Sequence, residues 1–348
     1  FGACGTCVVF NGEIYNYRQL RERLSDYPFR TQSDTEVIVA LYERKGLAGF
    51  RHLRGMYAFA LWDGQRGILV RDSRGIKPLF YAVEQGRLLF GSEAKAILAH
   101  GEGSTQLNLA ALHLLLNFRY VAGESTLFTN IVQVPPGAVL VWTPERLERQ
   151  YLAQPDGTSL NDLDLALSAA VQSHLVADVP LGCYLSGGID SALIARHACR
   201  HTAIEGFTLE VGDDPREADH AAETARWLKI PDYRQAFVIT EPVALHRSLV
   251  WHLEAPKVNA LQGAMLAEFT ARRVKVALSG LGGDELFYGY NAHRILWLAQ
   301  QARKLVPGSS NRWLASALVP LVKGRGLWSE PQRAVEMLAA LPDWARVY

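Results

Sequence analysis

Short apolar runs separated by polar or glycine-containing turns dominate residues 1–152 of the chain. Runs of this kind are typical of β-strands. We expect strands at residues 8–10, 58–62, 67–70, 79–82, 87–91 and 138–142. Ser33 or Asp34 followed by Glu36 is a typical helix start, so a helix is expected at 33–44. A second helix is expected at 17–24. Strands connected to helices in this order predict a layered α+β domain.

The pattern changes after the polar stretch at 154–159, which predicts a linker. Apolar positions between 163 and 175 then recur with helical spacing. Strand-like segments separated by helices follow, and strands are expected at 182–185, 206–211 and 274–278. This alternation predicts parallel βαβ units, and the Leu-, Ala- and Trp-rich tail at 292–348 is expected to be helical. Two domains are therefore expected, at 1–152 and 160–348.

The composition is that of a folded globular protein, because 49% of the residues are hydrophobic and 20% are charged. The 36 Lys and Arg residues are balanced by 35 Asp and Glu residues, whereas a nucleic-acid-binding protein needs a basic excess. No apolar stretch approaches the ~20 residues of a membrane-spanning helix, and no signal-peptide pattern opens the chain. Only four cysteines are present, which favours a reducing compartment. We expect a cytoplasmic protein that binds neither nucleic acid nor a membrane.

Two groups of residues have spacings that a metal site could use. Cys4 and Cys7 form a single CxxC, but no second pair of ligands lies nearby, so zinc is not expected. His197 and His201 lie one helical turn apart with Cys199 between them. The glutamate of an HExxH motif is missing there, which favours an ordinary helix face.

The strongest local signal is the segment 186–191, Ser-Gly-Gly-Ile-Asp-Ser, which follows an apolar strand and opens a helix. A helix start presents unpaired N–H groups that suit phosphate, and two glycines let the backbone approach an anion closely. Asp190 would repel bare phosphate, but carboxylate and phosphate can share one Mg²⁺ ion. The segment is not a Walker P-loop. The alternative is a plain glycine turn between a strand and a helix.

A second loop, 279–285, has the same design, Ser-Gly-Leu-Gly-Gly-Asp-Glu after an apolar strand. In a parallel sheet both loops would lie at the carboxyl edge of the strands, where ligands bind. We expect Asp190 and Asp284 to hold Mg²⁺ against the same triphosphate.

With these loops the chain resembles the glutamine-hydrolysing asparagine synthetases and their relatives. Matching elements occur in family order, at Phe10–Asn16 (FNGEIYN), Ser33–Ile38 (SDTEVI), Arg71–Asp72 with Gly75–Leu79 (GIKPL), Gly91–Ala96 (GSEAKA), Pro135–Gly137 (PPG), Asp178–Gly182 (DVPLG) and the two loops. The resemblance implies an α/β protein, with an incomplete N-terminal-nucleophile (αββα) glutaminase-like domain followed by a Rossmann-like parallel-sheet ATP-pyrophosphatase domain.

The resemblance also implies an activity. Family members release ammonia from glutamine, adenylate the side-chain carboxylate of aspartate with ATP and Mg²⁺, and form asparagine, AMP and pyrophosphate. The implied partners are small-molecule substrates, and the family suggests a homodimer. A related alternative is an amide-forming synthetase with another acceptor, of β-lactam-forming or peptide-cyclising type. A third is a non-catalytic nucleotide-binding remnant.

Site residues follow by motif match. The ATP phosphates would be held by Ser186, Gly187, Gly188, Asp190 and Ser191. The nucleoside would contact Leu209, Ser279 and Gly280. In the first domain Asn11 and Gly12 would form the oxyanion hole for the glutamine amide, while Glu13 and Asp34 would position glutamine, Asp34 through the α-ammonium group. The alternative for Asn11-Gly12 is a hairpin turn, since Asn-Gly is the strongest such dipeptide.

The sequence departs from the family pattern at three places. The catalytic cysteine should be residue 1, because its own α-amine is the base, but Phe1 stands there and Cys4-Gly5 only echoes the family start. Leu281 occupies a position that is acidic in many members. The lysine-bearing segment that the family places later is not found. We therefore expect a chain that lacks both ends of the family pattern and has no glutaminase activity as written.

Overall fold

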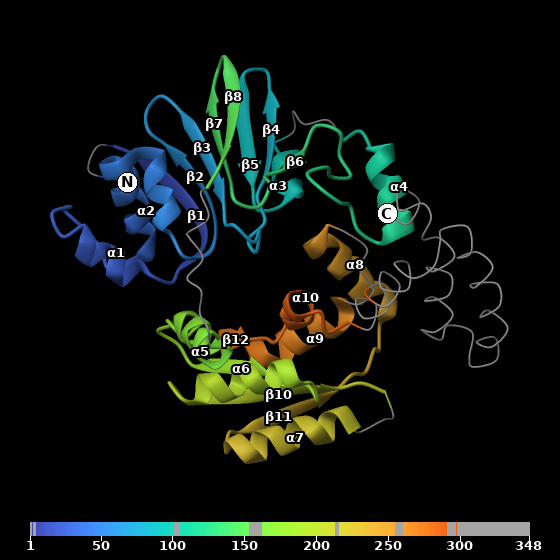
Figure 1. Cartoon of the computed structure of the whole chain (residues 1–348). Coiled ribbons are helices and arrows are strands. Elements are labelled where there is room, and N and C mark those ends of the chain that lie inside the picture. Colours follow the sequence, from blue (N-terminus) through green and yellow to red (C-terminus); the bar gives the residue numbers. More distant parts are fainter. Residues whose placement is uncertain are drawn as a thin grey trace, which may run out of the picture.

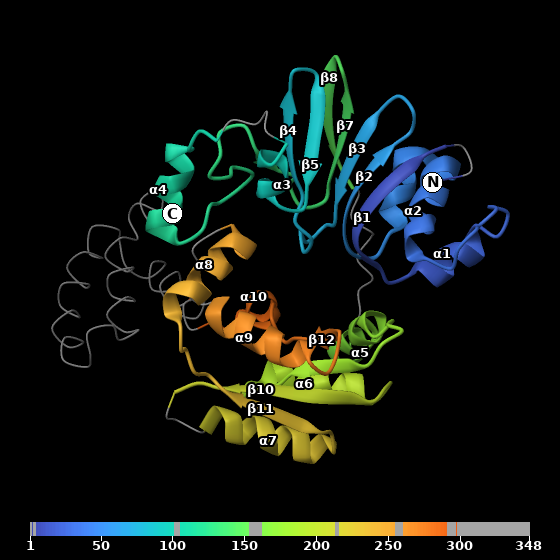
Figure 2. The same ribbon diagram turned by 180° about the vertical axis from the view of Figure 1, so that it is seen from behind.

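The computed structural model of the protein describes residues 2, 5–100, 105–152, 162–212, 216–254, 260–290 and 297. They form two parts, an upper one with two sheets and a lower one with a single sheet (Figure 1), and the reverse view shows the same division (Figure 2). None of the helices in these residues has the length and apolar character needed to cross a membrane.

The first part contains two antiparallel sheets. The larger sheet runs in the order β1 (Cys7–Ile14), β2 (Gly55–Trp62), β3 (Gly67–Arg71), β7 (Ala138–Thr143) and β8 (Arg146–Tyr151). The smaller sheet runs in the order β5 (Arg87–Gly91), β4 (Phe80–Glu84) and β6 (Val132–Gln133). Its helices are α1 (Tyr17–Arg23), α2 (Asp34–Lys45), the 3₁₀ helix η1 (Gly46–His52), α3 (Ala94–Leu98) and α4 (Leu109–Phe118).

Alternating side chains of β2 show why its apolar run is continuous. Phe59 and Leu61 pack into the core beneath α1, α2 and η1. Ala58 and Ala60 point to the opposite face and pack against the smaller sheet through residues such as Tyr81. Because both faces of the larger sheet are covered, its central strands lack the polar positions of a half-exposed strand.

Helix α3 covers the outer face of the smaller sheet, where Ala94 and Ile97 pack against Ala82 and Ile131. The layers therefore follow the order helix, sheet, sheet, helix. This arrangement confirms the expected αββα architecture.

The second part is built on one parallel sheet with the order β11 (Asp232–Ala236), β10 (Ile204–Glu210), β9 (Leu181–Tyr184) and β12 (Val276–Leu278). Its helices are α5 (Leu163–His174), α6 (Ile189–Cys199), α7 (Arg216–Leu228), α8 (Pro242–Leu253), α9 (Ala260–Ala271) and α10 (Gly283–Phe287). The Rossmann-like parallel sheet expected from the sequence is confirmed.

Both faces of this sheet are covered. Leu181 and Cys183 of β9 pack with α5, α6 and α7 in one core. On the other face the ring of Phe207 lies 5.8 Å from the ring of Phe269 in α9. Parallel strands covered in this way place their carboxyl-end loops at one edge of the sheet, the position where such folds bind ligands.

Two expectations differ from the structure, and two lie outside the described residues. Three strands were expected in the second part, and the structure adds β11, a polar edge strand with no apolar run to reveal it. The Asn11-Gly12 hairpin alternative is wrong, because both residues lie inside β1 and pair with β2. The linker at 154–159 and the helical tail at 292–348 lie outside the described residues, Trp297 apart.

Candidate functional site

The two glycine-rich loops follow neighbouring strands. β9 and β12 pair in parallel, with Leu181 opposite Val276 and Cys183 opposite Leu278. The loops 186–191 and 279–285 therefore leave the same edge of the sheet. Leu209 lies two residues beyond Phe207, which pairs with Tyr184 at the end of β9, so it is near this edge as well.

The two loops also touch each other. A Cβ atom on Gly280 would lie 2.7 Å from the backbone nitrogen of Ser191 and 3.0 Å from the Cβ of Asp190. A Cβ atom on Gly283 would lie 2.5 Å from the carboxyl carbon of Asp190. At Gly280 the nearest atoms belong to the backbone, so a side chain there would force the loops to shift, whereas at Gly283 a side chain would displace the Asp190 carboxylate. The second loop therefore packs its glycines directly against Asp190.

Hydrogen bonds within the first loop hold its shape. The Ser191 hydroxyl is buried, accepts the N–H of Ser186 at 3.1 Å, and lies 3.1 Å from the carbonyl oxygen of Gly188. The N–H of Gly188 donates to the Ser186 hydroxyl at 3.2 Å. Ser191 therefore shapes the loop from inside, while Gly187 and Gly188 are exposed at the start of α6. No side chain caps that helix start, so its first N–H groups remain available to an anion.

The carboxylates of Asp190 and Asp284 suit a hard cation. Within the described residues, no hydrogen bond or ion pair joins either carboxylate to another group. The pKa of the Tyr290 hydroxyl is raised, chiefly by its hydrogen bond to Glu285, and the charges of Asp284 and Asp190 contribute. Both carboxylates thus lie within electrostatic range of one side chain. Carboxylate oxygens that are not engaged elsewhere are the donors that Mg²⁺ prefers.

Two other predicted residues of the second loop contact each other. The Leu281 side chain is 88% exposed, and its N–H donates to the Ser279 hydroxyl at 3.1 Å. A fully exposed apolar side chain beside the loop can contact a ligand, but it cannot hold a cation or move a proton.

The residues predicted to bind glutamine gather at the end of β1. The Asn11 side-chain amide donates to the Ser92 hydroxyl at 3.1 Å. Gly12 has a φ of +146°, and a Cβ atom there would collide with the main-chain oxygen of Met56. Glycine is therefore required at this position for β1 to pair closely with β2.

Glu13 and Asp34 lie close together. The Asp34 carboxylate accepts the N–H of Ile14 at 2.9 Å, which ties the start of α2 to β1. The pKa of Glu13 is raised, first by burial and then by the negative charge of Asp34, with a smaller contribution from Asp178 and an opposing one from Lys77. The four predicted residues are therefore brought together by the fold.

Arg71 and Asp72 form a buried charged pair whose structural role was not predicted from the sequence. The Asp72 carboxylate is 1% exposed and accepts the N–H groups of Tyr57, Arg74, Ile76 and Lys77 at 3.0–3.3 Å. Arg71 donates to the carbonyl oxygens of Gly75, Lys77 and Val134. Together they fix the 72–78 loop, which carries Lys77 toward Glu13. The signal was an Arg-Asp pair at the end of a buried strand, with Arg71 as the last residue of β3.

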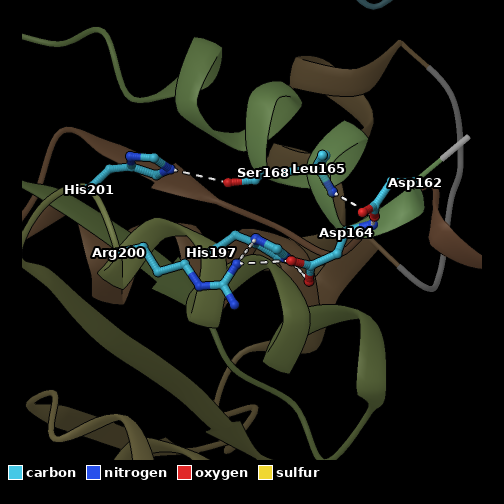
Figure 3. Close-up of polar contacts among 7 residues, drawn as sticks. All are labelled: Asp162, Asp164, Leu165, Ser168, His197, Arg200 and His201. Atoms are coloured by element: carbon cyan, nitrogen blue, oxygen red, sulfur yellow. Dashed lines mark hydrogen bonds and ion pairs between the residues drawn. The ribbon is translucent and has the colours of Figure 1, made fainter. Parts of the chain in front are cut away.

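His197 and His201 are directed at helix α5 (Figure 3). His197 is fully buried, with its Nε2 atom 3.4 Å from the Asp164 carboxylate, and Arg200 donates to the same carboxylate at 3.2 Å. His201 lies 3.4 Å from the Ser168 hydroxyl. The two histidines therefore make separate contacts between α6 and α5. Cys4, which with Cys7 forms the CxxC considered as a metal site, lies outside the described residues.

An αββα domain followed by a parallel α/β domain with paired glycine loops defines a two-domain protein of the glutamine amidotransferase and synthase class. Residues 3–152 match the glutamine amidotransferase domain family, and residues 162–346 match the asparagine synthase family. The chain belongs to the asparagine synthase family.

Curated relatives agree with this assignment. The chain is 34% identical over 306 residues to "Asparagine synthetase [glutamine-hydrolyzing] 1" of Bacillus subtilis, covering 82% of the chain and 48% of that protein. It is 34% identical over 324 residues to "Amidase chyE" of Penicillium rubens, with the same two coverages. The chain thus spans about half the length of these relatives.

Among solved structures, glutamine phosphoribosylpyrophosphate amidotransferase from B. subtilis, complexed with ADP and GMP, aligns with a TM-score of 0.33 and 17% identity, covering 67% of this chain and 47% of that one.

Proposed function

We propose that the protein is an ATP-dependent amide ligase of the asparagine synthetase type. The observation that carries the proposal is the direct contact between the loops 186–191 and 279–285, with Asp190 between them, at the carboxyl edge of the parallel sheet. One nucleotide could be held by both loops at that edge.

The residues 160–348 would form the ligase half. The uncapped N–H groups at the start of α6, beside the exposed residues Gly187 and Gly188, would bind phosphate oxygens, and Ser186 would add a hydroxyl. Ser191 would act by keeping the loop in shape, and Leu209, Ser279 and Gly280 would border the nucleoside. Asp190 and Asp284 would hold Mg²⁺, which when bound neutralises the charge that gathers on the pyrophosphate leaving group.

The residues 1–152 would form the glutamine half. Asn11 and the backbone at Gly12 would stabilise the oxyanion formed at the glutamine amide. Glu13 and Asp34 would position glutamine, Asp34 through its α-ammonium group. Ammonia released there would displace AMP from an acyl-adenylate in the other half. The nucleophile itself is not assigned to any described residue. A homodimer and a cytoplasmic location stay predictions.

Aspartate is the acceptor that we propose, since the relative with the asparagine synthetase name matches over both halves. A second candidate is an amide ligase with another carboxylate acceptor. The exposed Leu281 favours it, because this position is acidic in many members of the family.

Carboxylate-dependent exchange between pyrophosphate and ATP tests the proposal. We expect the full-length protein with Mg²⁺ to exchange label when aspartate is supplied, and the Asp190→Asn variant to lose the exchange. Exchange with another carboxylic acid but not with aspartate would support the second candidate. A protein that binds Mg²⁺–ATP but shows no exchange with any acid would be a nucleotide-binding remnant and would contradict both candidates.

A further inference from the structure

The carboxylate of Glu254, in the second part, is bound by the backbone of the first part. Glu254 Oε2 accepts the N–H of Ala94 at 2.7 Å, and Oε1 accepts the N–H of Lys95 at 2.6 Å. The residues are about 160 positions apart in the chain. Both views show α8, which ends just before Glu254, reaching up toward α3 (Figures 1 and 2).

The backbone of Glu254 adopts an unfavourable conformation. It follows α8 with φ 55° and ψ 18°, in the left-handed region that only glycine enters without strain. Its N–H donates to the carbonyl oxygen of Val250 at 2.8 Å. A charged side chain in this conformation, only 18% exposed, is held by its contacts elsewhere.

Lys95 strengthens the same contact from the other side. Its ammonium group donates to the carbonyl oxygen of Trp251 at 2.9 Å and lies 5.2 Å from the centre of the Trp251 ring. It also pairs with Glu93 at 2.7 Å. The first turn of α3 and the last turn of α8 therefore hold each other through groups from both parts.

The turn held in this way carries Ser92, the partner of Asn11. Ser92 lies two residues before Ala94, and its hydroxyl accepts the Asn11 side-chain amide at 3.1 Å. The turn is tight, because a Cβ atom on Gly91 would lie 3.2 Å from both the carbonyl oxygen of Glu93 and the Cβ of Ala96. A shift of the α3 start would therefore be passed to Ser92 and to Asn11.

We propose that Glu254 is a positioning residue: from the ligase half it fixes the Asn11 amide in the glutamine half, through the start of α3 and Ser92. The role of Asn11 in this statement rests on the proposed function. The contacts that link Glu254 to Asn11 through the start of α3 and Ser92 do not depend on that function, so their effect can be measured without glutamine or ATP turnover.

The test uses the chain labelled with ¹⁵N at asparagine, together with hydrogen exchange of the segment 92–98. Glu254→Gln keeps the shape of the side chain but removes its charge. We expect exchange in 92–98 to become about tenfold faster or more, and the Asn11 side-chain NH₂ signals to shift. Glu241→Gln, the same substitution at the other end of α8, is the matched control and should change neither.

Ser92→Ala isolates the last step of the relay. It should move the Asn11 signals as Glu254→Gln does, while leaving the exchange of 92–98 as in the unmodified protein. The proposal is overturned if Glu254→Gln speeds exchange in 92–98 but leaves Asn11 unchanged, because Glu254 would then only hold the two parts together. Unchanged exchange in 92–98, or an equal shift of Asn11 in the Glu241→Gln control, would also overturn it.

Discussion

Single glycines decide how closely the two loops of the candidate nucleotide site can approach. Gly280 packs against the backbone of Asp190 and Ser191, and Gly283 packs against the Asp190 carboxylate, so a Cβ atom at Gly280 would push the loops apart and one at Gly283 would displace the carboxylate. Neither of them has a positive φ, so the requirement is for space and not for backbone freedom. Their role in the site is to let Asp190 lie between the loops.

Gly280→Ala is therefore expected to push the loops apart. Overpacking of this kind typically costs 1–3 kcal/mol. Nucleotide binding would have to restore the displaced loop contact against that cost, so the affinity for Mg²⁺–ATP should fall about tenfold to a hundredfold, as measured by calorimetry. The matched control is Gly263→Ala in α9, where a Cβ atom meets nothing within 4 Å. That variant should bind as the unmodified protein does. Equal affinities for the two variants would contradict the packing argument.

At the residue scale the sequence allowed candidate residues to be named but not their contacts. Asp190 and Asp284 were candidates because glycine-rich turns after apolar strands carry them. The hydrogen bond between Asn11 and Ser92 was not, because the residues are 81 positions apart and only the fold brings them together. The burial of Asp72 was missed as well: its carboxylate accepts three N–H groups from the loop that follows it and one from Tyr57 in β2, an arrangement that residue types alone do not reveal.

At the scale of elements, a polar network fastens the β2–β3 hairpin to α2. Asp63, in the hairpin turn, accepts hydrogen bonds from Tyr42 of α2, from the N–H groups of Gln65 and Arg66, and from the Arg66 side chain. Burial alone would raise the pKa of Asp63, but these hydrogen bonds together lower it from 3.8 to about 2. The charged form is therefore the one that the folded state stabilises.

This network predicts part of the acid sensitivity of the first domain. A carboxyl group with a lowered pKa in the folded state stabilises the protein above its unfolded pKa, and this stabilisation is lost as the pH falls toward 2. The difference in unfolding free energy between the unmodified protein and Asp63→Asn should be about 2 kcal/mol at pH 7. It should narrow steadily between pH 5 and pH 3, as followed by urea unfolding at each pH.

An exposed carboxylate provides the comparison for that measurement. Asp26 pairs with Arg44 at 2.9 Å, but its side chain is 69% exposed. Asp26→Asn should change the unfolding free energy by less than about 1 kcal/mol at every pH. If the unfolding free energy of Asp63→Asn changed with pH in parallel with that of the unmodified protein, the hydrogen-bond network would not be the source of the acid sensitivity.

Strands with an apolar run were predictable, and the polar edge strands β8 and β11 were not. β2, β3 and β7 are continuous apolar runs because helices cover one face of their sheet and a second sheet covers the other. β8 is exposed along its whole length, and β11 reads Asp-Tyr-Arg-Gln-Ala, so neither has an apolar pattern. Pairing with a neighbouring strand, which composition does not reveal, makes them strands.

At the scale of the whole molecule, the two parts are joined by contacts that neither part predicts alone. Glu254 is bound at α3, and the rings of Tyr15 and His174 lie 4.3 Å apart at a second point of contact. The order of motifs predicted two domains in sequence, but the place where they touch depends on the orientation of α8 and α5. Such long-range geometry is set by packing.

The central claim is that the loops 186–191 and 279–285 form one site for a magnesium-bound nucleotide. Calorimetric titration of Mg²⁺–ATP into the unmodified protein, Asp190→Asn, Asp284→Asn and the double variant tests it most directly. We expect each single variant to bind at least about tenfold more weakly, and the double variant to bind less weakly than the product of the two effects, because the two carboxylates would share one ion. Full affinity in both single variants, or effects that multiply independently, would contradict the claim.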